Sequence, residues 1–255
     1  MNAIVSRSLA VSLIAVVLST PLLAAQAELL WANNRTGHEI MITRYVDQQW
    51  SEVESIYQSD NPITSVAMTT DLDGSKIVIF SEVFKTRTVL MKMQMHPQAK
   101  IWSKAKLFVD FAKENLAASL VTDAANTVWV FWSANNGDLD DIYFSRRTSL
   151  GWSPPQRVNE KNDVPDIKPQ ASINTKGDVE VNWQTYSWTL RNYQRTRSVL
   201  QTESITTEKD KNLPNSEVSL KEIPLPPIAK KQLSSLIHFP GNIHLQSIRL
   251  ESVSN

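Results

Sequence analysis

The 255-residue sequence predicts an all-β protein in which one small antiparallel sheet recurs along the chain. Three observations lead to this prediction. The dipeptide Trp-Ser recurs at intervals of 52 and 50 residues, a second column of large aromatic residues keeps step with it, and strand-like runs fill each interval. The Trp-Ser dipeptides begin at Trp50, Trp102 and Trp152, and the second column is Trp31, Phe80, Trp132 and Trp183.

Residues 1–27 have the pattern of a secretory signal peptide. Arg7 supplies the positive start, Leu9 to Leu18 forms an apolar run broken only by Ser12, and Ala25-Gln26-Ala27 gives a small-residue cleavage site. The run is short for a membrane span, so an uncleaved anchor is the less favoured alternative. No later segment is apolar enough to cross a membrane. We therefore expect a periplasmic or secreted protein.

Residues 28–190 carry the repeats, and each period contains four strand-like segments. The first ends in a turn rich in Asp, Asn and Gly, the second and third are strand-like, with strict alternation in Asp178–Trp183, and the fourth starts at Trp-Ser. The first segments are Ser65–Thr70, Ala118–Thr122 and Gln170–Asn174, with turns at Asp71–Gly74, Asp123–Asn126 and Asn174–Gly177. The second are Lys76–Phe80, Thr127–Trp132 and Asp178–Trp183, and the third are Glu39–Thr43, Thr88–Lys92 and Asp141–Ser145.

Four antiparallel strands in about fifty residues, repeated in tandem, are typical of the blades of a β-propeller. The fold class predicted is thus a β-propeller of about four blade equivalents, incomplete or closed by the C-terminus. A β-sandwich is the alternative. An α/β fold is disfavoured, because only Lys104 to Leu116 approaches a helical pattern, enough for one turn.

Residues 191–255 differ from the repeats. A strand is expected at Asn192–Gln201, then a polar loop at Glu203–Glu222 and a proline-rich linker at Ile223–Ile228. Leu236–Leu250 recovers strand character. Since the first visible strand, Glu28–Trp31, matches the second strand of a blade, we expect Leu236–Leu250 to complete that blade and remove its exposed edge.

The segment Ser145-Arg-Arg-Thr-Ser-Leu-Gly-Trp152 resembles the Asp-box (BNR) repeat of sialidase-like propellers, S-x-D-x-G-x-x-W, in the spacing of Ser and Trp. Arg147 and Ser149 stand where the motif has Asp and Gly. The Ser, Asp and Gly positions hold Thr43, Tyr45 and Asp47 in the first repeat, and Met95, Pro97 and Ala99 in the second. The resemblance covers roughly residues 29–185 and is one of degenerate blade pattern.

The resemblance implies a fold more than an activity, since the box lies far from the catalytic pocket in sialidases. Family enzymes carry an arginine triad, an acid Asp and a Tyr/Glu pair, usually with Arg-Ile-Pro near the N-terminus. No Arg-Ile-Pro occurs here, and Arg44, Arg146 and Arg147 end third strands, away from the expected axis. No catalytic residue can be assigned, and sialidase-like rings normally use six blades.

Two groups of residues are candidate sites. Tyr186 and Trp188 follow the last clear strand and are the candidate ligand-binding pair. Asp138, Asp140 and Asp141 could bind Ca²⁺, although a solvated turn is the favoured interpretation and no cofactor is otherwise expected. The four histidines fit no zinc motif.

Composition narrows the function classes. The 26 basic and 26 acidic residues give no electrostatic support for a nucleic-acid partner, and without Cys there is neither a disulfide nor a thiolate nucleophile. The favoured function is a non-catalytic envelope module that binds a glycan or a protein. The alternatives are a degenerate sialidase-like glycoside hydrolase and a structural subunit that assembles with a partner or as a homo-oligomer.

Overall fold

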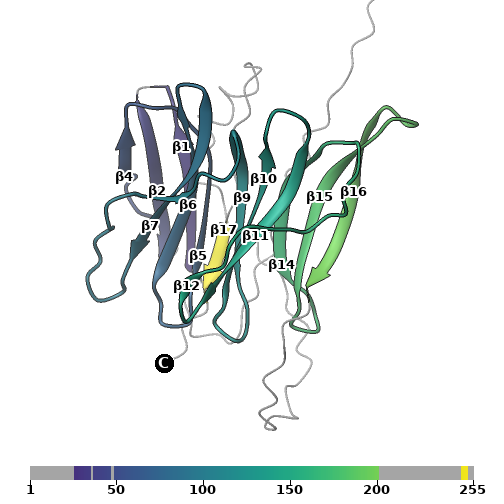
Figure 1. Ribbon diagram of the computed structural model, residues 1–255. Coiled ribbons are helices and arrows are strands. Elements are labelled where there is room, and N and C mark those ends of the chain that lie inside the picture. The colour runs from purple at the N-terminus through teal and green to yellow at the C-terminus, as the bar shows by residue number, and fades with distance from the viewer. Residues whose placement is uncertain (1–25, 36, 47–48, 201–247, 252–255) are drawn as a thin grey trace, which may run out of the picture.

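The computed structural model describes residues 26–35, 37–46, 49–200 and 248–251, and every regular element among them is a β-strand (Figure 1). The predictions of an all-β fold and of antiparallel sheets are confirmed for these residues. None of them lies in a helix long and apolar enough to cross a membrane. Lys104–Leu116 contains no helical turn; it contains strand β8 (Lys106–Val109).

The strands follow the predicted period, and we group them into four repeats. Repeat 1 contains β1 (Gln26–Asn33), β2 (His38–Val46), β3 (Gln49–Trp50) and β4 (Glu54–Ser59). Repeat 2 contains β5 (Ile63–Thr70), β6 (Lys76–Phe84), β7 (Arg87–Met95) and β8. Repeat 3 contains β9 (Glu114–Thr122), β10 (Val128–Asn135), β11 (Asp140–Thr148), β12 (Gly151–Trp152) and β13 (Gln156–Arg157). Repeat 4 contains β14 (Asp166–Ile173), β15 (Val179–Ser187) and β16 (Asn192–Leu200), where a strand was predicted.

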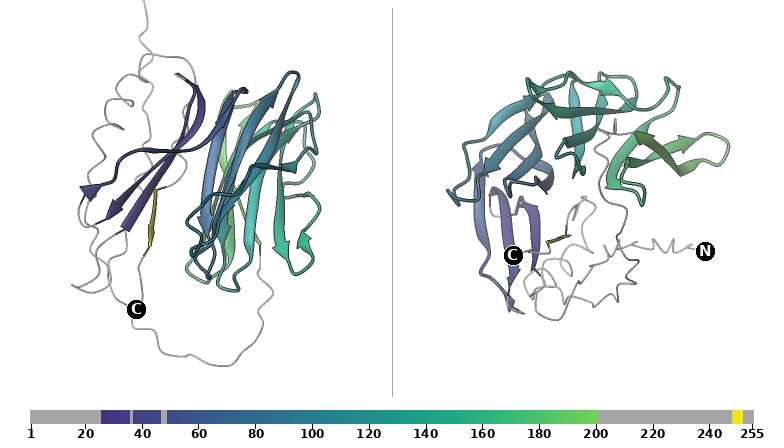
Figure 2. Two further views of the ribbon diagram at one scale, coloured as in Figure 1. Left: turned by 90° about the vertical axis from the view of Figure 1, so that its left-hand side faces the viewer. Right: turned by 90° about the horizontal axis from the view of Figure 1, so that it is seen from below.

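The repeats stand one after another around a common centre, as the right-hand view of Figure 2 shows. Neighbouring strands within each repeat are antiparallel, and within the described ranges one parallel pair, Thr88 with Glu114, links repeats 2 and 3 into one nine-stranded sheet. The described residues form an open arc and do not close into a ring.

One edge of β1 pairs with β2, and the other pairs with a strand from the far end of the chain, β17 (Ile248–Glu251), which runs antiparallel to β1 (Figure 1). Most of the expected closing segment, residues 236–247, lies outside the described residues, as do the predicted polar loop and the proline-rich linker. Residues 1–25 of the predicted signal peptide also lie outside them, and β1 begins at Gln26.

The three Trp-Ser dipeptides occupy equivalent positions, as predicted. In each, the serine N–H donates to the backbone carbonyl of a residue on β2, β7 or β11. The backbone N–H of that strand residue donates in return to the serine Oγ. The pairs are Ser51 with Arg44 (2.7 and 3.1 Å), Ser103 with Gln94 (2.8 and 3.0 Å) and Ser153 with Arg146 (2.9 and 3.0 Å). This two-bond serine clamp fixes where the fourth strand begins, because each bond satisfies a backbone group.

The alignment of repeat 2 with the Asp-box was wrong by two residues. Ser103 is clamped nine residues after its partner, whereas Ser51 and Ser153 are clamped seven residues after theirs. The hairpin loop of repeat 2 is therefore two residues longer. Thr43 and Ser145 donate their hydroxyls to the carbonyls of Ser51 and Ser153, and the equivalent position is Met93 rather than Met95.

The turns between first and second strands are confirmed. Asp71, Asp123 and Asn174 each accept a backbone N–H four residues ahead with the side-chain Oδ1, at 2.9, 2.8 and 3.0 Å. The fourth turn residues have φ of +81° (Gly74), +61° (Asn126) and +87° (Gly177). Only Gly and Asn reach this left-handed region at low cost, so the composition of the turns follows from their shape.

Apolar side chains fill three successive interfaces between the repeats, an arrangement that a two-sheet sandwich does not have. Phe80, Trp132 and Trp183 of the aromatic column each pack toward the preceding repeat. Burying both faces of every inner sheet in this way is the main source of stability in stacked repeats. The interfaces include Leu30, Ile42, Val66 and Met93 (repeats 1 and 2), Ile79, Leu90 and Val130 (repeats 2 and 3), and Phe131, Ile142, Phe144 and Val181 (repeats 3 and 4).

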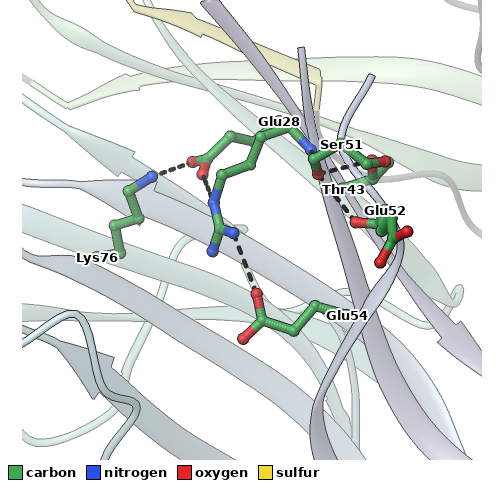
Figure 3. Close-up of polar contacts among 7 residues, drawn as sticks. Glu28, Thr43, Ser51, Glu52, Glu54 and Lys76 are labelled. Atoms are coloured by element: carbon green, nitrogen blue, oxygen red, sulfur yellow. Dashed lines mark hydrogen bonds and ion pairs between the residues drawn. The ribbon is translucent and has the colours of Figure 1, made fainter. Parts of the chain in front are cut away.

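Ion pairs reinforce the junction of repeats 1 and 2. The buried Glu28 carboxylate lies between Lys76 Nζ of repeat 2, at 2.5 Å, and Arg44 Nε of its own sheet, at 3.0 Å. Arg44 also reaches Glu54 at 3.1 Å. Figure 3 shows Glu28, Lys76 and Glu54 at this junction. Two carboxylates thus neutralise two cations at this junction.

We expect Glu28→Gln to lower the free energy of unfolding by about 3 kcal/mol, because it leaves the largely buried Lys76 ammonium without its counter-charge. Glu54→Gln is the matched control, since Glu54 binds the same Arg44 but is half exposed, and it should cost less than about 1 kcal/mol. Urea denaturation of both variants tests this. Equal losses would contradict a junction held by Glu28.

Candidate functional site

The predicted ligand-binding pair forms an aromatic cluster at the end of repeat 4. The Tyr186 ring lies 4.8 Å from Trp188 and 5.3 Å from Tyr193, both in edge-to-face geometry. Trp188 is 63% exposed and Tyr193 is 44% exposed. Tyr186 and Tyr193 face each other across the β15–β16 pair, while Trp188 begins the turn that joins the two strands. We call Tyr186, Trp188 and Tyr193 the aromatic cluster.

The cluster borders the face of repeat 4 that points away from repeat 3. In repeat 3 the corresponding face carries Trp129, Phe131, Ile142 and Phe144, all buried against repeat 4. Aligning Trp132 with Trp183 and following the strand pairings gives the equivalent residues in repeat 4. They are Glu180, Asn182, Arg195 and Arg197.

The four polar residues form one network across β15 and β16. Arg197 Nη2 donates to Glu180 Oε2 at 3.0 Å, and Asn182 Nδ2 donates to Glu180 Oε1 at 3.0 Å. Arg195 Nε donates to Asn182 Oδ1 at 3.2 Å. The two Nη groups of Arg195, which is exposed, have no partner among the described residues. The face therefore offers fixed donors and acceptors beside exposed aromatic rings.

Sequence reasoning identified Tyr186 and Trp188 but missed Tyr193, Arg195 and Arg197 as neighbours. Arg195 and Arg197 lie within the strand predicted at Asn192–Gln201, for which no site was predicted. The signal that could have found them is the register: in a two-residue alternation, Asn182, Gln184 and Tyr186 share a face, and a hairpin partner shares it with them.

In the acidic loop of repeat 3, Asp138 is exposed, while Asp140 and Asp141 have different hydrogen-bond partners. Asp140 accepts from Asn135 Nδ2 at 3.3 Å, whereas Asp141 accepts from Asn159 Nδ2 at 2.8 Å and from Arg157 Nη1 at 3.4 Å. Burial, and then the nearby Glu114 and Asp141, raise the pKa of Asp140. Among the described residues no three His, Asp or Glu side chains are grouped to hold a metal ion. The Ca²⁺ interpretation stays a prediction.

Buried carboxylates at two junctions are held by several donors each. Glu82 accepts from Tyr57, Ser59 and Asn61, which lie in repeat 1 and in the link to repeat 2. At the link into repeat 4, Asp166, 1% exposed, accepts from Asn159 Nδ2, Asn162 Nδ2 and Trp183 Nε1, each at 2.8 Å, and from Thr185 Oγ1. Such carboxylates tie loops to the sheets.

The three arginines at the ends of the predicted third strands each contact a nearby residue. Arg44 binds Glu28, Arg146 lies over the Trp129 ring at 5.3 Å, and Arg147 Nη1 binds the buried Asp71 at 2.9 Å. The described histidines also have local contacts: His38 Nδ1 with Asn34 and His96 Nδ1 with Ser75.

Comparison with known proteins gives similarity in structure only. No protein-family model matches the sequence, and no curated protein does. Solved structures with a similar backbone include a protein of unknown function from Dyadobacter fermentans DSM 18053 (TM-score 0.48, 12% identity) and an α-L-arabinofuranosidase from Lactobacillus brevis (0.47, 10%). The alignments cover 62% and 64% of this chain, and the chain spans only 53% and 62% of those proteins.

A NanB sialidase from Streptococcus pneumoniae is also similar, with a TM-score of 0.49 and 13% identity over 67% of this chain and 28% of that one. At this level the comparisons concern the arrangement of strands. They include sialidase and glycoside hydrolase structures of related fold, and they do not support the narrower Asp-box assignment, which stays a prediction.

We expect Asp166→Asn to lower the free energy of unfolding by about 3 kcal/mol, because an amide N–H₂ would face N–H and O–H donors in place of an acceptor oxygen. Asp163→Asn, on the exposed loop just before it, should change stability by less than about 0.5 kcal/mol. Thermal and urea denaturation measure both. Wild-type stability in Asp166→Asn would mean that the buried carboxylate does not hold the loop.

Proposed function

We propose that the protein is a secreted or periplasmic, non-catalytic module of β-propeller type that binds a glycan on the outward face of repeat 4. The repeats correspond to four blades in this proposal, with β17 supplying the innermost strand of the first. One observation supports this proposal. The outward face of repeat 4 is polar and bordered by exposed aromatic rings, whereas the corresponding face of repeat 3 is apolar and packs on repeat 4.

The chemistry of the face suits a hydroxylated ligand. The C–H faces of a sugar ring pack on aromatic side chains such as Trp188 and Tyr193, whose rings supply large apolar area. Sugar hydroxyls both donate and accept, so they can pair with the Arg195 guanidinium and with Gln184, which is exposed on the same face. Since the Glu180–Asn182–Arg195–Arg197 network is already assembled, little ordering is needed on binding.

The alternative of a sialidase-like hydrolase has weaker support. The buried Glu82 and Asp166 are surrounded by donors from structural loops, and Arg44, Arg146 and Arg147 are engaged separately. A structural subunit assembled from several copies remains a prediction that mass measurement in solution tests.

The test is a glycan array probed with the mature protein, residues 28–255, followed by calorimetry on the best ligand. Trp188→Ala should weaken binding about tenfold, the equivalent of about 1.4 kcal/mol. Leu190→Ala is the matched control, because Leu190 is 59% exposed on the same hairpin but lacks a ring. It should bind as the wild type does, and neither variant should unfold at a lower temperature.

Two outcomes would contradict the proposal. One is binding of the same glycan by Trp188→Ala with unchanged affinity, which would place the site elsewhere. The other is hydrolysis of a sialoside or arabinoside substrate by the wild-type protein, which would replace a binding module with an enzyme.

A further inference from the structure

A second unusual position lies at the junction of repeats 2 and 3. Lys92 on β7 is paired with Ile79, whose side chain lies in the apolar cluster between these repeats, so Lys92 projects toward repeat 3. The equivalent third-strand residues are Ile42 in repeat 1 and Phe144 in repeat 3, both buried in apolar clusters, and Arg197 in the terminal repeat 4, where it is paired with Glu180. Burying part of the Lys92 ammonium at a position that is apolar in repeats 1 and 3 costs desolvation free energy, unless a counter-charge or hydrogen bonds offset it.

Two further cations lie next to Lys92. Lys106 on β8 is its directly opposite cross-strand partner, an arrangement in which like charges repel. Arg147 comes from repeat 3, where it is paired with Trp152. The corresponding partners of Trp50 and Trp102 are Tyr45 and Met95, so Arg147 is a second cation in a position that is apolar or aromatic elsewhere.

The Trp152 ring contacts Lys92 and Phe108. Lys92 Nζ lies over this ring, 5.6 Å from the centroid, and Phe108 packs edge-on against it at 4.9 Å. Burial, and then the nearby Lys106 and Arg147, lower the pKa of Lys92, the direction expected for an ammonium without a nearby anion. The packing fixes the stem of Lys92 and leaves its charge near the surface.

The charges here are not balanced as they are at the neighbouring junction. Between repeats 1 and 2, Arg44 and Lys76 are neutralised by Glu28 and Glu54 within 3.1 Å. Among the described residues, neither Lys92 nor Lys106 has an ion-paired carboxylate. Arg147 differs from the two lysines, because its Nη1 binds Asp71 and its charge also interacts with Asp73; no hydrogen bond of its other guanidinium nitrogens is found in the described part of the chain.

We propose that Lys92, Lys106 and Arg147 form a binding site for an oxyanionic group, a sulfate, phosphate or carboxylate carried by a ligand. Three cations from two repeats converge where the fold elsewhere places apolar side chains or matched ion pairs. A bound oxyanion supplies the negative charge that the two lysines lack, and it accepts charge-assisted hydrogen bonds from both ammonium groups and from the part of the Arg147 guanidinium that does not bind Asp71. This site is separate from the aromatic cluster on repeat 4 and does not depend on it.

The test is calorimetric titration of the wild-type protein with sodium sulfate, sodium phosphate and sodium acetate, each at matched ionic strength. Matching is needed because sulfate and phosphate also stabilise proteins without binding a site. We expect saturable binding of at least one anion, and the preferred anion identifies the group that the ligand carries. Lys92→Met should raise the Kd at least about tenfold, since it removes one charge-assisted bond.

Lys92→Met also separates binding from structure. Met fits the apolar position held by Ile42 and Phe144 elsewhere, so the variant should melt at or above the wild-type temperature while losing the anion. Lys104→Met is the matched control, because Lys104 is an exposed lysine on the same segment as Lys106, and it should bind as the wild type does. Lys106→Met, at an exposed position, is a second variant that should weaken binding without affecting folding.

The proposal is overturned if the wild-type protein binds none of the three anions saturably. It is equally overturned if Lys92→Met and Lys106→Met both bind the preferred anion with the affinity of Lys104→Met. A lower melting temperature for Lys92→Met, with unchanged anion binding, would show that Lys92 serves only the fold.

Discussion

The structure depends on one constraint: a sheet with two apolar faces is stable only when both are covered. Each inner repeat meets this constraint by packing one face on the preceding repeat and the other on the following one. The aromatic column supplies the large side chain that points backward in each sheet, and the serine clamp sets where the outer strand starts. Together they position every later element relative to the one before.

The same constraint makes the end of the series informative. Repeat 4 has an apolar face toward repeat 3, with Val181 and Trp183, and a polar face with Asn182 and Arg195 on the other side. A further sheet packed there would have to desolvate two arginines and a carboxylate. Among the described residues, the apolar stacking therefore ends at this polar face, as it does at capping repeats in other repeat proteins.

The sequence was sufficient for the features that repeat. The Trp-Ser spacing predicted three equivalent clamps, and the turns at Asp71, Asp123 and Asn174 followed from residues that favour left-handed backbone. The prediction was wrong where one repeat differs from the others in length. Because the hairpin of repeat 2 is longer, the sequence alignment matched Met95 with Thr43 and Ser145, whereas the structure matches Met93 with them. Counting residues back from the Trp-Ser dipeptide cannot reveal an insertion in the hairpin loop just before it.

The candidate sites were harder to predict, because each is defined by a residue that breaks the pattern. Lys92 stands among strand-like apolar residues and draws attention only when its pairing with Ile79 and Lys106 is known. Arg195 and Tyr193 share a face with Tyr186 only through the hairpin register. The cross-strand partner of a residue is a property of the folded chain, so such sites are not visible in one linear sequence.

The start of β1 has a consequence for the proposed signal peptide. Ala27 is 1% exposed and paired with Tyr45 on one side and Leu250 on the other. A peptidase that cuts after Ala27 needs this backbone extended and free in its own active site. Under the proposal of a signal peptide cleaved after Ala27, cleavage would therefore have to come before the first sheet assembles, and it would remove Gln26 and Ala27 from the start of β1.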